Sequence, residues 1–239
     1  MKFISNNKIE EMTLNRISEF ETKFGRVKLP IPLDPIIEQV FNLTISWDSL
    51  GKETLGGLDP QERLLAINED YFDLFKEKPG LERFTKAHEL GHWDLHVDEA
   101  KLSHSSFFDS KNSEFFFRKM TPKGNLLYII KNSWLDSEIY KMLKTKYAHR
   151  DSPMVASQVG KYASYLLMPT HLVKEYIEEV NPDIYSWPSL FKMAEVFDVT
   201  ITALKVRLMQ MGLIYVSEDF KDKKIYSSKE EYFGQMKLI

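Results

Sequence analysis

The stretch FTKAHELGHWDLH, residues 84–96, carries three histidines spaced four residues apart, and a glutamate directly follows the first. Residues four apart on a helix share one face, so the imidazoles of His88 and His92 would reach one metal ion together. Glu89 would point partly aside, where a carboxylate can hold and deprotonate a water molecule. This H-E-x-x-H pattern predicts two zinc ligands and a general base, the set that a hydrolase needs.

The same histidines could instead lie on a solvent-exposed face of the helix without binding a metal ion. Their neighbours Phe84, Ala87, Leu90 and Gly91 are apolar or small, which is typical of a helix that is buried on several sides. Buried imidazoles need a polar partner, and a metal ion is a common one. The context therefore favours metal binding.

His96 extends the spacing by one more step. If the helix continued, His96 would lie about 12 Å along the axis from His88, too far for all three imidazoles to share one ion. We therefore expect His96 to make a hydrogen bond, either to one of the metal ligands or at the helix end. If the helix breaks before Leu95, His96 could itself be a ligand. His104, His149 and His171 have no motif around them.

The composition sets further limits. The chain has 239 residues with 43% hydrophobic and 28% charged residues, a formal net charge of -3 and no cysteine. Disulfides and thiolate ligands are thus impossible, and zinc must be held by His, Asp or Glu. The start shows no signal peptide and no apolar run reaches membrane-spanning length, so we expect a cytoplasmic protein with no membrane partner.

The hydrophobic pattern predicts an α+β fold with a small sheet ahead of the histidine helix. We expect a surface helix over 1–24, an extended proline-rich entry over 29–35 and a short helix over 36–43. Strands at 43–50 and 63–70 would be joined by the glycine and proline turn 51–60. The histidine helix should run over 82–95.

The pattern of the second half predicts a mostly helical structure. After a long loop over 98–125, with a possible strand at 114–120, helices are expected at 133–148 and 151–168. Pro169 would stop the latter and Thr170 would cap the next helix. Residues 189–212 indicate helix, tight turn and helix, with Thr200 as N-cap and Gly212 as terminator. The charged tail from 217 is expected at the periphery.

On these motifs the chain resembles the ImmA/IrrE family of metallopeptidases. The resemblance rests on RFTKAHELGHWDLH, on the preceding PIPLDPIIEQVFNLTI and GGLDPQERLLAINED, on SQVGKYASYLLMPTHLV at 157–173 and on MAEVFDVTITALKVRLMQMGLI. It covers about residues 28 to 215 and implies a zincin-like peptidase core. It also implies that His88 and His92 bind Zn²⁺, that Glu89 is the base, and that the substrate is a helix-turn-helix repressor of mobile-element or stress-response genes.

One position departs from the family pattern. The family's third ligand is a glutamate ahead of the Leu-Leu-Met-Pro stretch, and alignment on Leu166–Pro169 places it at Ala156. The change would leave a natural impaired enzyme or an engineered inactive one, unless another group serves. Gln158 through its carbonyl and Asp151 after a register shift are the alternatives, although Asp151 suits an N-cap better. Ala156, Gly160 and Ala163 would form a small-residue stripe that lets the histidine helix approach.

We expect a peptidase domain over 1–180, with a loop insertion at about 98–130, and a helix-turn-helix-like helical module with a tail over 181–239. Two other functions remain open. A non-catalytic regulatory protein would keep the peptidase fold to sequester a regulator. A DNA-binding regulator would use Thr202, Lys205 and Arg207 within 189–212, but this basic footprint is thin, so we expect no direct nucleic-acid binding.

Overall fold

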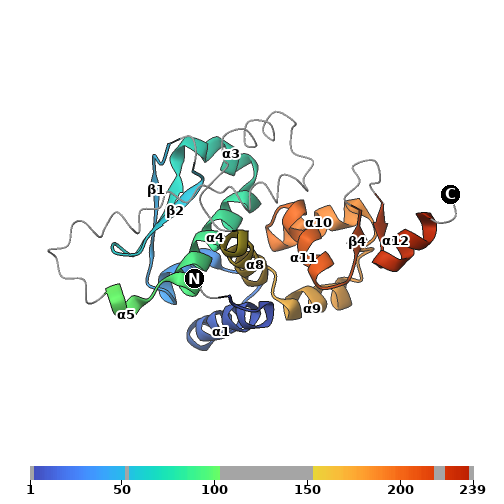
Figure 1. The fold of residues 1–239 in the computed structure, drawn as a ribbon, viewed down its shortest axis with the longest axis horizontal. Coiled ribbons are helices and arrows are strands. Elements are labelled where there is room, and N and C mark those ends of the chain that lie inside the picture. Colours follow the sequence, from blue (N-terminus) through green and yellow to red (C-terminus); the bar gives the residue numbers. More distant parts are fainter. Residues whose placement is uncertain (1–2, 52–53, 103–152, 218–223, 237–239) are drawn as a thin grey trace.

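A computed structural model describes residues 3–51, 54–102, 153–217 and 224–236. The chain is α+β and mostly helical, as the sequence predicts (Figure 1). The first half holds α1 (Asn6–Phe24), α2 (Leu33–Gln39), β1 (Thr44–Asp48), β2 (Gly56–Asp59), β3 (Leu64–Asn68), a 3-10 turn (Glu69–Tyr71), α3 (Phe72–Glu77), α4 (Pro79–His96) and α5 (Glu99–Leu102). The second half holds α8 (Pro153–Leu167), α9 (Thr170–Val180), α10 (Trp187–Phe197), α11 (Ile201–Gln210), β4 (Tyr215–Val216), β5 (Ile225–Tyr226) and α12 (Lys229–Met236).

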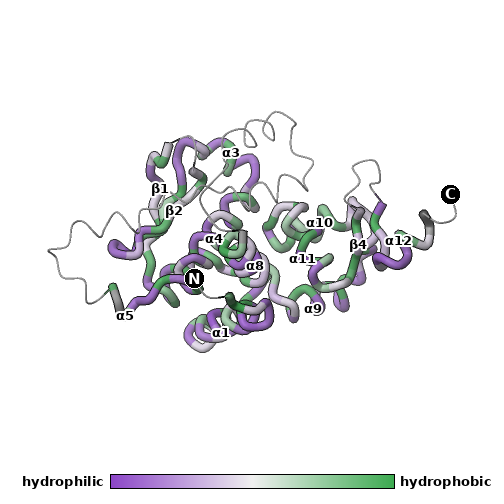
Figure 2. The backbone as a smooth tube through the Cα atoms, in the orientation of Figure 1, coloured by the Kyte–Doolittle hydropathy of each residue, from purple (hydrophilic) through white to green (hydrophobic). Residues whose placement is uncertain are grey.

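Helix α1 forms where the sequence predicts an N-terminal helix. Its hydrophobic positions recur between hydrophilic ones (Figure 2), and the buried residues Ile9, Thr13, Ile17 and Phe20 are three or four apart. This spacing places them along one stripe that packs on the core. The side chain of Ser5 caps the start by accepting a hydrogen bond from the backbone N–H of Lys8.

The expected small sheet forms, but its two predicted strands are not joined by a turn. Strands β1 and β3 are parallel, and β2 lies within the segment expected as a turn and pairs antiparallel with β3, which gives the order β1-β3-β2. A parallel pair cannot be closed by a tight turn, so the connection must cross back, and here it contributes β2 on the way. The hairpin is thus β2–β3, and its turn begins where the Asp59 carboxylate accepts from the backbone N–H of Gln61 and Glu62.

Two helices begin earlier than predicted. Helix α2 begins at Leu33, so Pro35 lies in its first turn rather than in an extended entry. Helix α4 begins at Pro79 and ends at His96, one turn longer at its start than expected. Both helices can begin at or before a proline, because the N–H groups of the first turn have no intrahelical partner and proline lacks this group.

Helix α4 lies between the sheet on one side and α8 on the other, and α8 also packs on α1 (Figure 1). At the contact with α8, a Cβ on Gly91 would lie 3.1 Å from the ring of Tyr162. The small residue that permits this close approach is therefore on α4 and faces a tyrosine. Of the expected small-residue stripe on α8, Ala156 and Ala163 are buried, whereas Gly160 is half-buried.

The C-terminal helices confirm most of the predicted boundaries. The Thr200 hydroxyl caps α11 by accepting from the backbone N–H of Ala203, and Gly212 adopts a φ of 70° just beyond the helix. The expected Thr170 cap is wrong: Pro169 occupies the N-cap position, and Thr170 is the first helical residue and donates its hydroxyl to Glu10 instead.

The charged tail is expected at the periphery, but part of it packs against the rest of the protein. Strands β4 and β5 pair antiparallel, and Ile225, Tyr226 and Tyr232 are buried. One apolar cluster extends from α1 through α4 and α8 to α10, α11 and β5. The boundary at 180/181 remains a prediction.

The expected loop over 98–125 begins with the short helix α5, and the expected elements at 114–120 and 133–148 lie outside the described residues. No helix among the described residues combines the length and the apolar character that are needed to span a membrane.

Candidate metal centre

The first feature of the site is the burial of the H-E-x-x-H residues. His88, Glu89 and His92 are 7%, 3% and 2% exposed. All three lie on α4, whose middle turns are covered by β2, β3 and α8. A solvated helix face is therefore wrong for this segment.

The two imidazoles are arranged as a pair. The Nε2 atoms of His88 and His92 lie 3.2 Å apart, and the ring planes are inclined at 72°. Two nitrogens bound at about 2.0–2.1 Å to one tetrahedral zinc ion are separated by about 3.3–3.4 Å. The spacing of the two nitrogens therefore fits two corners of a zinc site.

The protonation state of the two imidazoles also suits metal binding. Burial lowers the pKa of His88 to about 4. Burial, followed by the neighbouring His88 and His96, lowers the pKa of His92 well below its ordinary value. Both imidazoles are thus neutral near pH 7, and the neutral ring is the form that binds a metal ion.

Glu89 lies against the edge strand of the sheet. A Cβ built on Gly56 of β2 would lie 3.4 Å from Cγ of Glu89. The carboxylate therefore leaves α4 beside the sheet edge, next to the histidine pair in sequence and close to strand β2 in space.

Helix α4 continues through His96. His96 is therefore too far along the helix axis from His88 for all three imidazoles to share one ion. Its ring centroid is 5.9 Å from that of His92. Burial lowers the pKa of His96, and its Nε2 is buried without a hydrogen-bond partner in the described part of the chain. In the part that the structure describes, no three His, Asp or Glu side chains form a cluster that could hold a metal ion.

The third-ligand position stays open. Ala156 lies buried on α8 at 7% exposure and offers no ligand atom. Gln158 is also buried. Its Nε2 lies 3.4 Å from the carbonyl oxygen of Ile4 at the start of α1, while its Oε1 makes no hydrogen bond to any described residue. Asp151 lies outside the described residues. The described helices thus bring together two candidate ligands, His88 and His92.

Sequence reasoning missed a charged clamp behind the histidine helix. The Asp94 side chain is 2% exposed and accepts hydrogen bonds from Arg16 Nη2 at 2.7 Å and from the Tyr162 hydroxyl at 2.8 Å. The hydrogen bond to Asp94 raises the pKa of Arg16, and burial raises that of Tyr162. This clamp joins α1, α4 and α8, and no local pattern links residues so far apart in the chain.

The residues considered for DNA reading are mostly inside the protein. Thr202 and Arg207 are 3% and 2% exposed. Arg207 donates to the Met168 carbonyl at 2.9 Å, to the Thr170 hydroxyl at 2.8 Å and to Glu10 at 3.1 Å. It joins α11 to the end of α8, so it cannot also reach a DNA groove.

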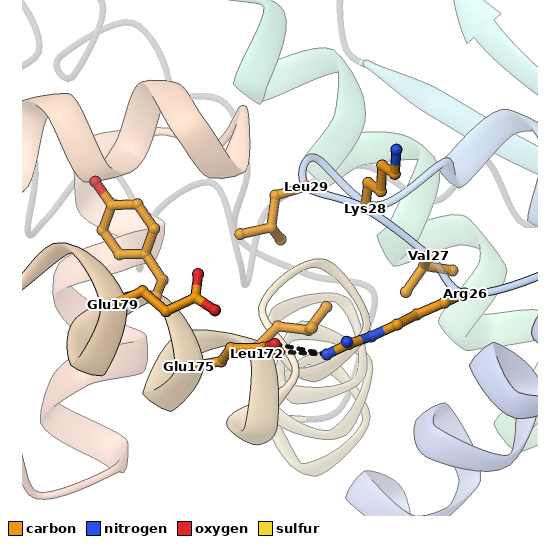
Figure 3. A pocket seen from close by; sticks show the side chains of 8 residues that line it. Arg26, Val27, Lys28, Leu29, Leu172, Glu175 and Glu179 are labelled. Carbon is orange, nitrogen blue, oxygen red and sulfur yellow. Dashed lines mark hydrogen bonds and ion pairs between the residues drawn. The ribbon is translucent and has the colours of Figure 1, made fainter.

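A separate cavity of about 340 Å³ lies between residues 26–29 and α9 (Figure 3). Its Arg26 guanidinium is paired with Glu175 at 2.6 Å. None of the predicted site residues lines this cavity. It lies apart from the histidine pair and has no part in the candidate centre.

Comparison with models of known protein families and with curated proteins gives no match to this chain.

Proposed function

We propose that the protein is a zinc-dependent metallopeptidase of the ImmA/IrrE type with a zincin-like core. It would act in the cytoplasm and cleave a helix-turn-helix transcriptional repressor, which would derepress mobile-element or stress-response genes. The observation that carries the proposal is the 3.2 Å separation of the His88 and His92 Nε2 atoms on a buried helix, with Glu89 beside them.

His88 and His92 would hold the zinc ion through Nε2. When bound, zinc supplies the Lewis acidity that polarises the scissile carbonyl and makes water more acidic. Glu89 accepts a proton from the attacking water, whose oxygen forms the new bond to the carbonyl carbon. As the C–N bond breaks, Glu89 passes that proton to the leaving amine.

The sheet supports an extended substrate. Strand β2 lies at an edge of the order β1-β3-β2, and a Cβ built on Gly56 of this strand would lie 3.4 Å from Cγ of Glu89. Extended peptides often add to an exposed sheet edge through main-chain hydrogen bonds. A peptide paired with β2 would place its carbonyl groups near the base.

A second candidate function is a non-catalytic regulator that retains the peptidase fold and sequesters its partner. Ala156 favours this alternative, because two imidazoles without a carboxylate hold zinc less tightly than a complete three-ligand set. The burial of Arg207 and Thr202 argues against the DNA-binding alternative.

Metal analysis and cleavage together decide between the first two functions. Purified protein should contain about one zinc per chain. Incubation with a panel of helix-turn-helix repressors should produce one chelator-sensitive cut, detected by intact-mass spectrometry. Zinc binding with tight repressor binding and no cut would favour sequestration, and absence of zinc binding would reject the metallopeptidase.

A further inference from the structure

We propose that Gly56 is a positioning residue for Glu89. Because Gly56 lacks a side chain, strand β2 packs closely on α4 beside the side chains of Thr85 and Glu89. This inference rests on the proposed role of Glu89 as the base.

The contact leaves no room for a methyl group. A Cβ at Gly56 would lie 2.7 Å from Thr85 Cγ2, 3.2 Å from the Ala66 carbonyl oxygen and 3.4 Å from Glu89 Cγ. Thr85 and Glu89 are one helical turn apart and therefore share the face of α4 that meets the strand. The φ of Gly56 lies outside the left-handed region, so glycine is needed here for space rather than for backbone freedom.

Strand β2 is not free to retreat from α4. Gly56 pairs with Ile67, and the backbone N–H of Asn68 donates to the carbonyl of Leu55 at 2.9 Å. The buried Asn68 side-chain amide also donates to the carbonyls of Gly51 and Thr54, at 2.7 and 2.6 Å. An added methyl group would therefore displace the α4 side chains before it displaced the strand.

Thr85 provides the matching half of this steric pair. Its hydroxyl donates to the Leu81 carbonyl at 2.9 Å, while its Cγ2 is the atom nearest to the position of a Gly56 Cβ. Serine at position 85 would keep the hydroxyl and remove the colliding methyl group. The effect of Gly56→Ala should thus depend on what residue 85 carries.

The test compares four zinc-loaded proteins: wild type, Gly56→Ala, Thr85→Ser and the double variant. Gly57→Ala is the matched control, since a Cβ at Gly57 would meet only Leu50 Cδ1 at 3.9 Å. The measurements are kcat and KM for repressor cleavage, zinc content, and the ¹³Cδ chemical shift of the Glu89 carboxyl at fixed pH, assigned with Glu89→Gln.

Gly56→Ala should lower kcat by about tenfold to a hundredfold with little change in KM, because a small misplacement of a catalytic group has effects of this size. Zinc content should stay unchanged, and the Glu89 signal should shift. The double variant should recover most of the kcat and the wild-type signal, and Gly57→Ala should match wild type in zinc content and in the Glu89 signal.

If wild type cleaves no repressor, the proposed function fails, and the Glu89 signal alone decides the positioning role. A Glu89 signal in Gly56→Ala equal to that of Gly57→Ala would overturn the inference. If Gly56→Ala does not fold, the double variant decides: a wild-type Glu89 signal supports the steric pair, and a shifted one refutes it.

Discussion

The Nε2 atoms of His88 and His92 lie 3.2 Å apart on the buried face of α4. Two neutral ring nitrogens at this separation can share one metal ion. The ordinary i, i+4 spacing of a helix therefore brings two candidate ligand nitrogens together in the metal-free protein.

We predict that His88→Ala or His92→Ala abolishes stoichiometric zinc binding, because a single imidazole cannot hold the ion at micromolar protein concentration. Elemental analysis after gel filtration checks this result. His171→Ala, at an exposed position on α9, is the matched control and should retain zinc. Undiminished metal in both helix variants would reject the site.

Glu89→Gln should preserve the fold and most of the zinc affinity, because the ligands remain. Cleavage should fall by about a thousandfold or more, since an amide cannot accept the proton from water. Single-turnover cleavage followed by mass spectrometry measures the effect. Glu178→Gln, on the exposed side of α9, should cleave like wild type, whereas unchanged cleavage by Glu89→Gln would show that another group is the base.

Ala156→Glu should strengthen zinc binding by about tenfold or more and raise peptidase activity, because the carboxylate would complete a three-ligand site. Without metal the same variant should be less stable than wild type, since it buries an unpaired carboxylate. Zinc titration and thermal unfolding with and without chelator measure both effects.

Gln158→Glu is the control for the third-ligand alignment, because it puts a carboxylate on the same helix two residues away. Equal or weaker zinc binding by Ala156→Glu would refute position 156. A gain confined to Gln158→Glu would move the third ligand to that position.

The metal-free protein should lose stability as the pH falls from about 6.5 toward 4. The pKa of His88 is lowered to about 4 in the folded state, so the unfolded chain binds more protons in this window and unfolding becomes easier. His88 alone contributes on the order of 3 kcal/mol to this loss. Urea unfolding of chelator-treated protein at several pH values should show a shallower pH dependence for His88→Gln than for wild type.

Arg207→Ala should destabilise the protein by about 2 to 4 kcal/mol, because it leaves the Met168 carbonyl and the Glu10 carboxylate without their buried partner. Lys192→Ala, at an exposed position on α10, should have little effect. Binding to duplex DNA should be weak in both variants and in wild type. A DNA affinity that falls in Arg207→Ala at unchanged stability would contradict the structural role of this arginine.

The sequence by itself determined the local features. The H-E-x-x-H helix, α1, α8 and the α10–α11 pair follow from side-chain spacing, and the Thr200 cap and Gly212 terminator follow from residue types that favour those positions. These features depend on residues within one or two turns, so a short window of sequence contains the interactions that stabilise them.

Only the tertiary structure decided the long-range features. The four residues of β2 have no alternating pattern, and they become a strand because β3 offers a paired edge. Arg16 and Asp94, Arg207 and Met168, and Gly56 and Thr85 are brought together by the packing of distant elements. From sequence alone, a charged side chain is predicted to lie at the surface. It is buried only where a partner from another element offsets the free-energy cost of removing it from water.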